Sequence, residues 1–323
     1  MAQARGDGSL NGKLVVLLGG SGFFGRHAAQ ELLARGARLR IASRNPERAF
    51  ALKPLGNLGQ VQFVRCDVTR PQSLASALAG ADGVVNLVGA FSGDLDTLQG
   101  RGAGRIAEAA RASGVGAFVH VSANGADPDS PVDYARTKGE GEEAVLAAFP
   151  KATILRPSIL FGPDDQFVNR FARLIALLPA LPVFAPEARL QPVLVDDAAE
   201  AVAQALGNPG AHGGKTYEIC GPEVMTMLAL NQRIAAAQGR DRLLIALPDL
   251  AANAFVSLTG WLPIAPITLD QWALLRDGNV ASGKLPGGKA LGVTPRPLGL
   301  FLDRWMVRYR KHGRFGVKSS AGR

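Results

Sequence analysis

The stretch that decides the fold is Lys13-Leu-Val-Val-Leu-Leu-Gly-Gly-Ser-Gly-Phe-Phe-Gly25, near the start of the chain. Its five apolar residues, 14–18, predict a strand buried on both faces, as strands of parallel sheets are. The glycines permit a tight turn that brings backbone N–H groups close to a ligand, and apolar residues then recur at helical spacing. Gly20-x-Gly22-x-x-Gly25 is the dinucleotide fingerprint, although a glycine-rich turn without a ligand would carry the same residues.

Composition sets limits on the class of protein. Of 323 residues, 47% are hydrophobic and 20% are charged, which is typical of a globular protein. The formal net charge of +9 favours contact with phosphates, an anionic membrane surface or an acidic protein face. No motif supports nucleic-acid binding, and the histidines and cysteines show no metal-ligand spacing, so we expect neither nucleic acid nor metal. No apolar run is long enough to span a bilayer, which favours a cytoplasmic protein, either soluble or peripheral.

Strands and helices alternate after the glycine turn. Helical patterns separate further strand patterns at residues 38–43, 61–66, 83–89, 117–122 and 152–156. This alternation predicts an α/β fold, a doubly wound parallel Rossmann sheet whose ligand binds at the carboxyl ends of the strands. We place the NAD(P)-binding core at residues 12–157. A smaller C-terminal cap region follows at 158–297, from which residues 193–206 return to the core, and a basic amphipathic tail ends the chain at 298–323.

The end of the second strand bears on the choice of nucleotide. NAD-binding proteins usually place an acidic residue there to bind the ribose 2′-OH, whereas this chain has Ser43-Arg44. A guanidinium suits the 2′-phosphate of NADP, so we expect NADP(H) rather than NAD(H), with Arg48 as a second contact. Glu47 keeps NAD open as an alternative, and Arg44 would otherwise be a solvent-exposed strand end.

Other strand ends supply further candidates for nucleotide contact. Asp67 and Val68 follow the third strand and would hold an adenine through a carboxylate and a backbone amide. Gly89 ends the fourth strand and Pro157 the sixth, beside the expected position of the nicotinamide. The full set of candidate cofactor-binding residues is Gly19, Gly20, Ser21, Gly22, Phe23, Phe24, Gly25, Ser43, Arg44, Asp67, Val68, Val88, Gly89, Tyr134, Lys138 and Pro157.

Three residues form a candidate catalytic set. Tyr134 and Lys138 lie one helical turn apart and therefore share a helix face, and Ser122 ends the fifth strand. A lysine ammonium lowers the pKa of a nearby phenol, so the tyrosine can pass a proton to a carbonyl while the serine hydroxyl donates to the same oxygen. The alternative is structural: an exposed tyrosine over an alkyl stem, and a serine that caps a strand.

Several segments of the sequence resemble one known protein superfamily. They are the glycine turn, Tyr134-x-x-x-Lys138, His120-Val-Ser-Ala-Asn-Gly-Ala-Asp127, the run Arg156 to Phe167, Gln191-Pro-Val-Leu-Val-Asp-Asp197 and Tyr217-Glu-Ile-Cys-Gly-Pro222. Together they resemble the extended and atypical short-chain dehydrogenase/reductases, of the NAD-dependent epimerase/dehydratase type. Within that superfamily they look closest to the NADPH-binding Rossmann accessory subunit of respiratory complex I and its bacterial relatives.

The resemblance implies two functions. Proteins like that accessory subunit hold NADPH for structure or assembly in quinone-linked respiration, which would make respiratory complex I a partner. Other members are active NADP-dependent reductases, or epimerases and dehydratases, on small carbonyl or nucleotide-sugar substrates. The presence of Ser122, Tyr134 and Lys138 keeps this second function open.

The end of the chain is basic and amphipathic. Phe301, Leu302, Trp305 and Met306 fall on one helical face, and Arg304, Arg308 and Lys311 lie along its flank. This pattern predicts an interfacial helix that meets either an anionic membrane or an acidic protein groove. It would place the protein peripherally on the inner face of the respiratory membrane. The alternative is that the last helix packs on the cap region.

Overall fold

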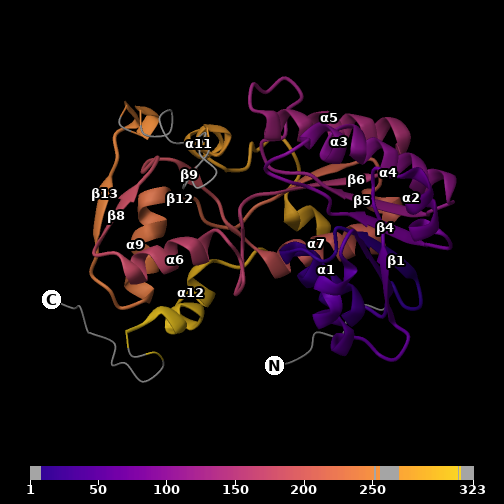
Figure 1. Ribbon diagram of the computed structural model, residues 1–323, viewed down its shortest axis with the longest axis horizontal. Coiled ribbons are helices and arrows are strands. Elements are labelled where there is room, and N and C mark those ends of the chain that lie inside the picture. Colours follow the sequence, from indigo (N-terminus) through magenta and orange to yellow (C-terminus); the bar gives the residue numbers. More distant parts are fainter. Residues whose placement is uncertain (1–8, 251, 255–268, 312, 314–323) are drawn as a thin grey trace. The chain divides into compact units, whose positions relative to one another are not determined.

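The computed structural model describes residues 9–250, 252–254, 269–311 and 313 (Figure 1). The chain divides into two compact units. Unit 1 comprises Met1–Pro157, Val195–Ile219 and Ser282–Thr294, and unit 2 comprises Ser158–Leu194, Cys220–Ala281 and Pro295–Arg323. Among the helices in the described ranges, none has both the length and the apolar character that a bilayer span requires.

Unit 1 is built on a parallel sheet. The described residues form seven strands in the order β11-β6-β5-β4-β1-β2-β3, and every neighbouring pair is parallel. The strands are β1 (Leu14–Leu18), β2 (Arg38–Ser43), β3 (Val61–Arg65), β4 (Gly83–Asn86), β5 (Ala117–Val121), β6 (Thr153–Pro157) and β11 (Thr216–Ile219). All five residues of β1 and of β5 are buried, because helices cover both faces of the sheet.

The helices of unit 1 lie in two layers. In Figure 1, α1 and α7 lie on one side of the sheet, and α2, α3, α4 and α5 lie on the other. The helices are α1 (Phe23–Ala34), η1 (Pro46–Leu55), α2 (Pro71–Leu78), α3 (Leu95–Gln99), α4 (Arg101–Ala112), α5 (Asp133–Ala148), α7 (Val195–Gly207), α8 (Pro209–His212) and η2 (Gly288–Leu291). This arrangement confirms the predicted doubly wound Rossmann sheet.

Unit 1 takes up more of the later chain than the sequence pattern indicates. The sequence assigns residues 207–297 to the cap region, but β11 pairs with β6, with Tyr217 opposite Leu155. Residues 282–294 also pack in unit 1, where the backbone N–H of Ser282 donates to the buried carboxylate of Glu218 at 3.0 and 3.1 Å. These pairings join residues far apart in the chain, so local pattern does not reveal them.

Unit 2 combines short strand pairs with helices. β7 (Leu160–Phe161) pairs with β10 (Val193–Leu194), β8 (Ala180–Val183) with β13 (Leu243–Ala246), and β9 (Arg189–Leu190) with β12 (Met225–Thr226). Its helices are α6 (Val168–Leu177), α9 (Met227–Ala237), α11 (Leu269–Arg276), α12 (Gly299–Met306) and η3 (Val307–Tyr309). Apolar residues of α6, α9 and α12 share one core.

The apolar face of α12 packs inside unit 2. Leu302 and Met306 are buried in that core, and Phe301 and Trp305 pack against it. The guanidinium of Arg308 donates to Asn169 Oδ1 at 2.5 Å and to the carbonyl of Pro163. The structure therefore agrees with the cap-packing alternative, and the expectation that this face meets a membrane is wrong for the described helix. The end of the predicted tail, residue 312 and residues 314–323, lies outside the described residues.

Candidate functional site

The glycine turn lies at the carboxyl end of β1, in the middle of the sheet. Gly19 has φ +80°, and a Cβ there would lie 3.0 Å from the carbonyl oxygen of Leu87. A Cβ on Gly25 would lie 2.6 Å from the backbone of Gly20, so only glycine lets α1 begin this close to the strand. Gly22 caps α1 without a side-chain hydrogen bond, which leaves the helix N-terminus open to an anion. Ser21 completes the turn, and Phe23 and Phe24 begin the helix.

A basic hollow lies at the carboxyl ends of β2 and β3. Its volume is about 840 Å³, and its lining residues are Arg44, Asn45, Arg48, Arg65, Asp67, Arg70 and Ser73. Arg44, Arg48 and Arg65 are exposed, and their guanidinium groups make no hydrogen bond or ion pair with any described residue. Four guanidinium groups against one carboxylate make the hollow a site for an anion with more than one negative charge.

The adenine-side candidates lie beside this hollow. The Asp67 carboxylate accepts from the backbone N–H of Thr69 at 3.0 Å and from its hydroxyl at 2.7 Å. These hydrogen bonds are the main reason why the pKa of Asp67 lies below its usual value. The carboxylate is therefore charged and held in one position. Val68 follows it and is half-buried, and the hydroxyl oxygen of Ser43 is buried with no hydrogen-bond partner among the described residues.

The candidate catalytic residues lie at the ends of β4 and β5. The ammonium of the buried Lys138 donates to the carbonyl of Val121 at 3.2 Å, next to Ser122. A Cβ on Gly89 would lie 3.2 Å from the same Nζ, so the lysine lies along the end of β4. Ser122 Oγ and the Tyr134 hydroxyl have no hydrogen-bond partner among the described residues. The structure thus places the lysine beside the serine strand, but no hydrogen bond joins the three side chains to one another.

Burial controls the charge of this site. Desolvation lowers the pKa of Lys138 to about 8 and raises the pKa of Tyr134 to about 12. The phenol is therefore neutral near pH 7 and can donate a hydrogen bond, while the lysine remains mostly protonated there. Glu142, one turn beyond Lys138, partly offsets the desolvation of the ammonium. The same Glu142 is held by Arg156 through two hydrogen bonds of 2.8 Å.

A buried histidine adjoins the candidate catalytic set. Asn86 Oδ1 accepts from the backbone N–H of Val88 at 3.1 Å, so its Nδ2 donates to His120 Nδ1 at 3.0 Å. Because Nδ1 accepts, Nε2 carries the proton. Desolvation, and to a lesser degree the charge of Lys138, lower the pKa of His120 to about 3, so the ring is neutral. The hydrogen bond between Asn86 and His120 links the end of β4 to β5.

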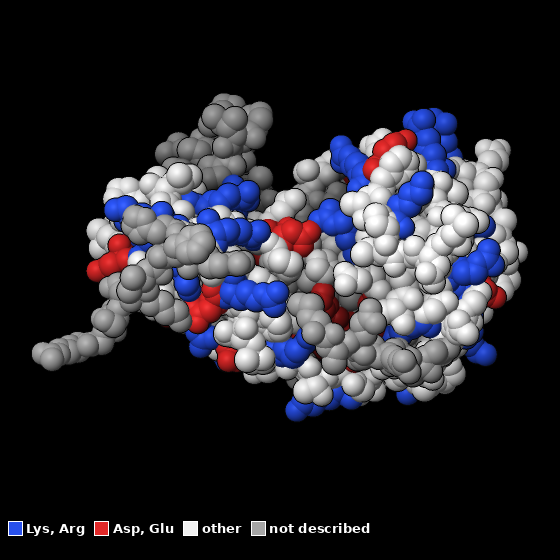
Figure 2. Space-filling view, turned by 90° about the horizontal axis from the view of Figure 1, so that it is seen from below, with Lys and Arg blue, Asp and Glu red and all other residues white. Residues whose placement is uncertain are grey.

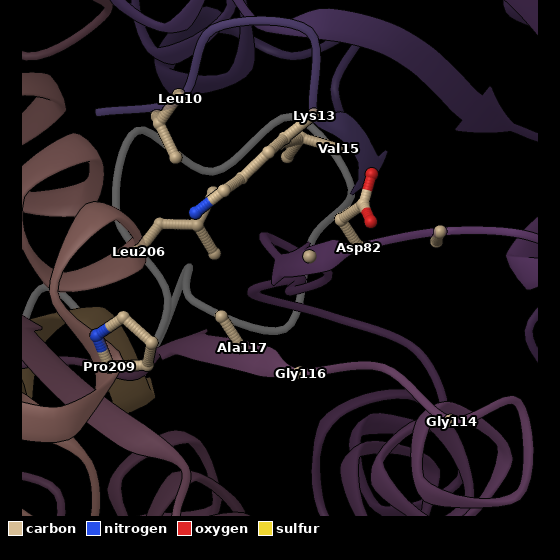
Figure 3. A pocket seen from close by; sticks show the side chains of 11 residues that line it. Leu10, Lys13, Val15, Asp82, Gly114, Gly116, Ala117, Leu206 and Pro209 are labelled. Carbon is tan, nitrogen blue, oxygen red and sulfur yellow. The ribbon is translucent and has the colours of Figure 1, made fainter. Parts of the chain in front are cut away.

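A second cavity lies at the amino ends of the strands, at the opposite end of the sheet from the glycine turn. Figure 3 shows its lining, which includes Leu10, Lys13, Asp82 and Leu206, and its volume is about 330 Å³. The Asp82 carboxylate accepts from the backbone N–H of Leu14 at 2.7 Å and so holds the start of β1. This cavity is at the amino ends of the strands and lies apart from the glycine turn. It contains none of the candidate site residues.

The residues present fit a nicotinamide dinucleotide. The glycine turn leaves room for a diphosphate, because the nearest atom to a Cβ on Gly22 would be the Gly19 oxygen at 3.5 Å. The basic hollow follows at the adenosine side, and Ser122 Oγ is a buried polar atom without a partner in the described structure. Pro157, whose carbonyl accepts from the N–H of Asn124 at 2.9 Å, closes β6. In the described residues no cluster of potential metal ligands occurs.

Sequence reasoning did not identify several residues of this region. They are Arg65, Arg70, Asn86, Phe91, Gln99 and Thr137. Asn86 carried a usable signal, because it is a polar residue inside an otherwise apolar strand. Arg65 is the exposed last residue of β3, and the others lie in loops and helices, where a polar or aromatic side chain is ordinary.

Comparisons with known proteins agree with this geometry. Residues 19–171 match the protein family described as NAD(P)H-binding. The chain is 31% identical over 315 residues to the mitochondrial NADH dehydrogenase (ubiquinone) 1 alpha subcomplex subunit 9 of Rattus norvegicus, covering 95% of this chain and 83% of the relative. It is 34% identical over 192 residues to the ceramide reductase of Caulobacter vibrioides, covering 58% of each.

Solved structures share the architecture. The NADPH-dependent quinone oxidoreductase of Escherichia coli, in complex with NADPH, has a TM-score of 0.70 with this chain at 21% identity. The match covers 90% of this chain and 99% of that one. This likeness shows a common fold.

Proposed function

Since the chain belongs to the NAD(P)H-binding family of the complex I subunit 9 proteins, we propose that it holds NADP(H) as a component of quinone-linked respiration, for structure or assembly. The observation that carries this proposal is the match along 95% of the chain to a named subunit of that complex. The bound nucleotide would fill the glycine turn and stiffen the ends of five strands. Binding of this kind stabilises the native state by an amount that grows with the logarithm of the nucleotide concentration, once that concentration exceeds the dissociation constant.

The arrangement of the candidate catalytic residues supports a holding role. A phenol with a pKa raised to about 12 is a weak proton donor. Lys138, which would make it more acidic, donates instead to the carbonyl of Val121. In the alternative case of an active enzyme, the bound nicotinamide would supply a hydride, and Ser122 and Tyr134 would hold the oxygen of the acceptor.

The preference for NADP(H) rests on the basic hollow. Arg44 directly follows β2, where an acidic residue would suit NAD, and Arg48, Arg65 and Arg70 line the same hollow. A charge-assisted contact between Arg44 and a 2′-phosphate is worth about 1.5–3 kcal/mol, or roughly tenfold to a hundredfold in affinity. We expect Arg44→Ala to weaken NADPH binding by that factor and to leave NADH binding nearly unchanged. Arg38→Ala, an exposed arginine at the other end of β2, is the matched control. Equal affinities for the two nucleotides in the wild-type protein would rule out the preference.

The respiratory partner can be tested on the native protein. Membranes solubilised in mild detergent should yield the protein together with the NADH-oxidising complex, and the bound nucleotide should exchange slowly. The chain has 36 lysines and arginines against 27 acidic residues, and Figure 2 shows basic side chains scattered over the surface. Attachment to the inner face of the respiratory membrane would follow from such charge and should weaken with salt. Recovery of the protein only in the soluble fraction, free of the complex, would refute the proposed partner.

The second candidate function is an active reductase. The residues that favour it are Ser122, Tyr134 and Lys138, and the ceramide reductase relative lends it support. Steady oxidation of added NADPH with a panel of carbonyl compounds, abolished in Tyr134→Phe, would favour this function. A protein that binds NADPH but consumes none with any of them would favour the holding role.

A further inference from the structure

An exposed aromatic ring covers the candidate catalytic tyrosine. Phe91, in the loop between β4 and α3, stacks on Tyr134 with ring centroids 4.6 Å apart and an interplanar angle of 13°. The Phe91 side chain is 63% exposed, so one of its faces meets the tyrosine and much of the remainder faces outward. Stacking covers the face of the phenol ring and leaves its hydroxyl at the ring edge.

The position of Phe91 is fixed by a buried tether. The backbone N–H of Ala90 donates to Gln99 Oε1 at 3.1 Å, and Gln99 Nε2 donates to Thr137 Oγ1 at 2.9 Å. Thr137 lies on α5, one turn beyond Tyr134, so the loop and the tyrosine helix are linked through one fully buried glutamine. Gly141 permits this link, because a Cβ there would lie 2.1 Å from the carbonyl oxygen of Gln99. The loop that carries Phe91 is therefore held in place, and the Phe91 ring forms one side of the candidate site.

Most polar groups near Phe91 already have hydrogen-bond partners within the protein. Both polar atoms of Gln99 are used in the tether, Asn86 bonds Val88 and His120, and the Lys138 ammonium donates to a backbone carbonyl. Among the described groups of unit 1 at this point, the Ser122 and Tyr134 hydroxyls and the buried Nε2–H of His120 have no partner. The two hydroxyls suit one carbonyl oxygen, and a single further N–H would leave most hydroxyls of a sugar without a partner on this side.

We propose that the site takes a planar aromatic carbonyl compound of the quinone type, with its ring against Phe91 and one carbonyl oxygen between Ser122 and Tyr134. The inference rests on the proposed nucleotide site, because the ligand would lie beside the nicotinamide end of that site. An offset stack on Phe91 provides affinity for a flat ring that a saturated ring of equal size would not gain. Phe91 is thus a residue that determines ligand specificity.

Equilibrium dialysis against two probes tests the proposal. The first is 2,3-dimethyl-1,4-naphthoquinone, whose blocked ring carbons do not add thiols, and the second is its fully saturated bicyclic dione. The protein is saturated with NADP⁺, so that neither probe is reduced. We expect the quinone to bind more tightly than the saturated dione, and Phe91→Leu to weaken quinone binding by about threefold to tenfold. Phe91→Trp should retain it.

The outcomes separate this inference from the nucleotide proposal. NADP⁺ affinity is measured in the same samples, and it should be the same in the wild-type protein and both variants. If the wild-type protein binds NADP⁺ but shows no preference for the quinone, the inference is overturned while the nucleotide site stands. Tighter quinone binding by Phe91→Leu would also overturn it, because Phe91 would then be a plug. If neither NADP⁺ nor quinone binds, both proposals are wrong.

Discussion

Replacing Lys138 with methionine tests the electrostatics of the site without any knowledge of a substrate. Lys138 is 4% exposed, and its burial lowers its pKa from 10.5 to about 8. Methionine has a similar length and no charge, so it fits the same space without the desolvation cost. The change also removes the hydrogen bond from Nζ to the Val121 carbonyl. We therefore expect the variant to be more stable than the wild-type protein near pH 7 and to lose that advantage at high pH.

The sign and size follow from proton linkage. Between pH 8 and pH 10.5 the unfolded chain binds the lysine proton and the folded chain does not, so wild-type stability rises with pH in this window. The rise attributable to Lys138 is about 3 kcal/mol, at about 1.4 kcal/mol per pKa unit. Losing the hydrogen bond costs about 1–2 kcal/mol at all pH values. The variant should thus gain about 1–2 kcal/mol at pH 7 and fall below the wild-type protein above pH 10.

The assay is urea unfolding followed by far-UV circular dichroism between pH 6 and pH 10.5. Lys151→Met, at an exposed lysine of the same unit, is the matched control and should follow the wild-type curve throughout. The informative quantity is the change with pH of the difference between Lys138→Met and the wild-type protein. A difference that stays constant over the whole range would refute the reasoning, since it would mean that burial does not shift this lysine.

Two further predictions concern contacts that stabilise the two units, one in each unit. Arg156→Met leaves the Glu142 carboxylate, 7% exposed, without its partner, and should destabilise unit 1 by about 3 kcal/mol in urea unfolding. Adding Glu142→Gln should restore most of that loss, and an unchanged midpoint for the single variant would contradict the role of this pair. Deleting the chain after Pro297 removes the buried Leu302 and Met306 from the core that contains Trp272, so tryptophan emission should shift to longer wavelength than in full-length Trp305→Phe, the control for the deleted Trp305. Equal emission from the truncated protein and this control would mean that α12 does not support this core.

The part of the fold that the sequence predicts depends on local pattern. The apolar run before Gly19 and the helical spacing after Gly25 identify the first βα unit, because both signals lie within a few residues. The strand register of β11 against β6 joins residues about 60 positions apart, and no local signal records it. The face of α12 shows the opposite case. Amphipathic spacing predicted its apolar side, but the pattern is the same for a side that meets lipid and a side that meets protein.

The candidate site was predictable where the chemistry is carried by one segment. The glycine turn, Arg44 and the Tyr134–Lys138 pair were all found from spacing. Arg65 was not, because it reaches the hollow only through the pairing of β3 with β2, which sets it opposite Ser43. Phe91 was not found either, because its contact with Tyr134 depends on a loop that the tether from Gln99 to Thr137 holds in place.

The most direct test of the central claim, that the glycine turn holds a nicotinamide dinucleotide, is a calorimetric titration of NADPH into Gly22→Ala. Gly22 has φ −75° and ψ 177°, which alanine adopts, and its Cβ would meet no protein atom closer than 3.5 Å. The fold should therefore be unaffected, with a melting temperature equal to that of the wild-type protein or slightly higher. The added methyl would occupy the space through which the diphosphate approaches the backbone, so NADPH affinity should fall at least tenfold. Undiminished NADPH binding by this folded variant would contradict the assignment of the site.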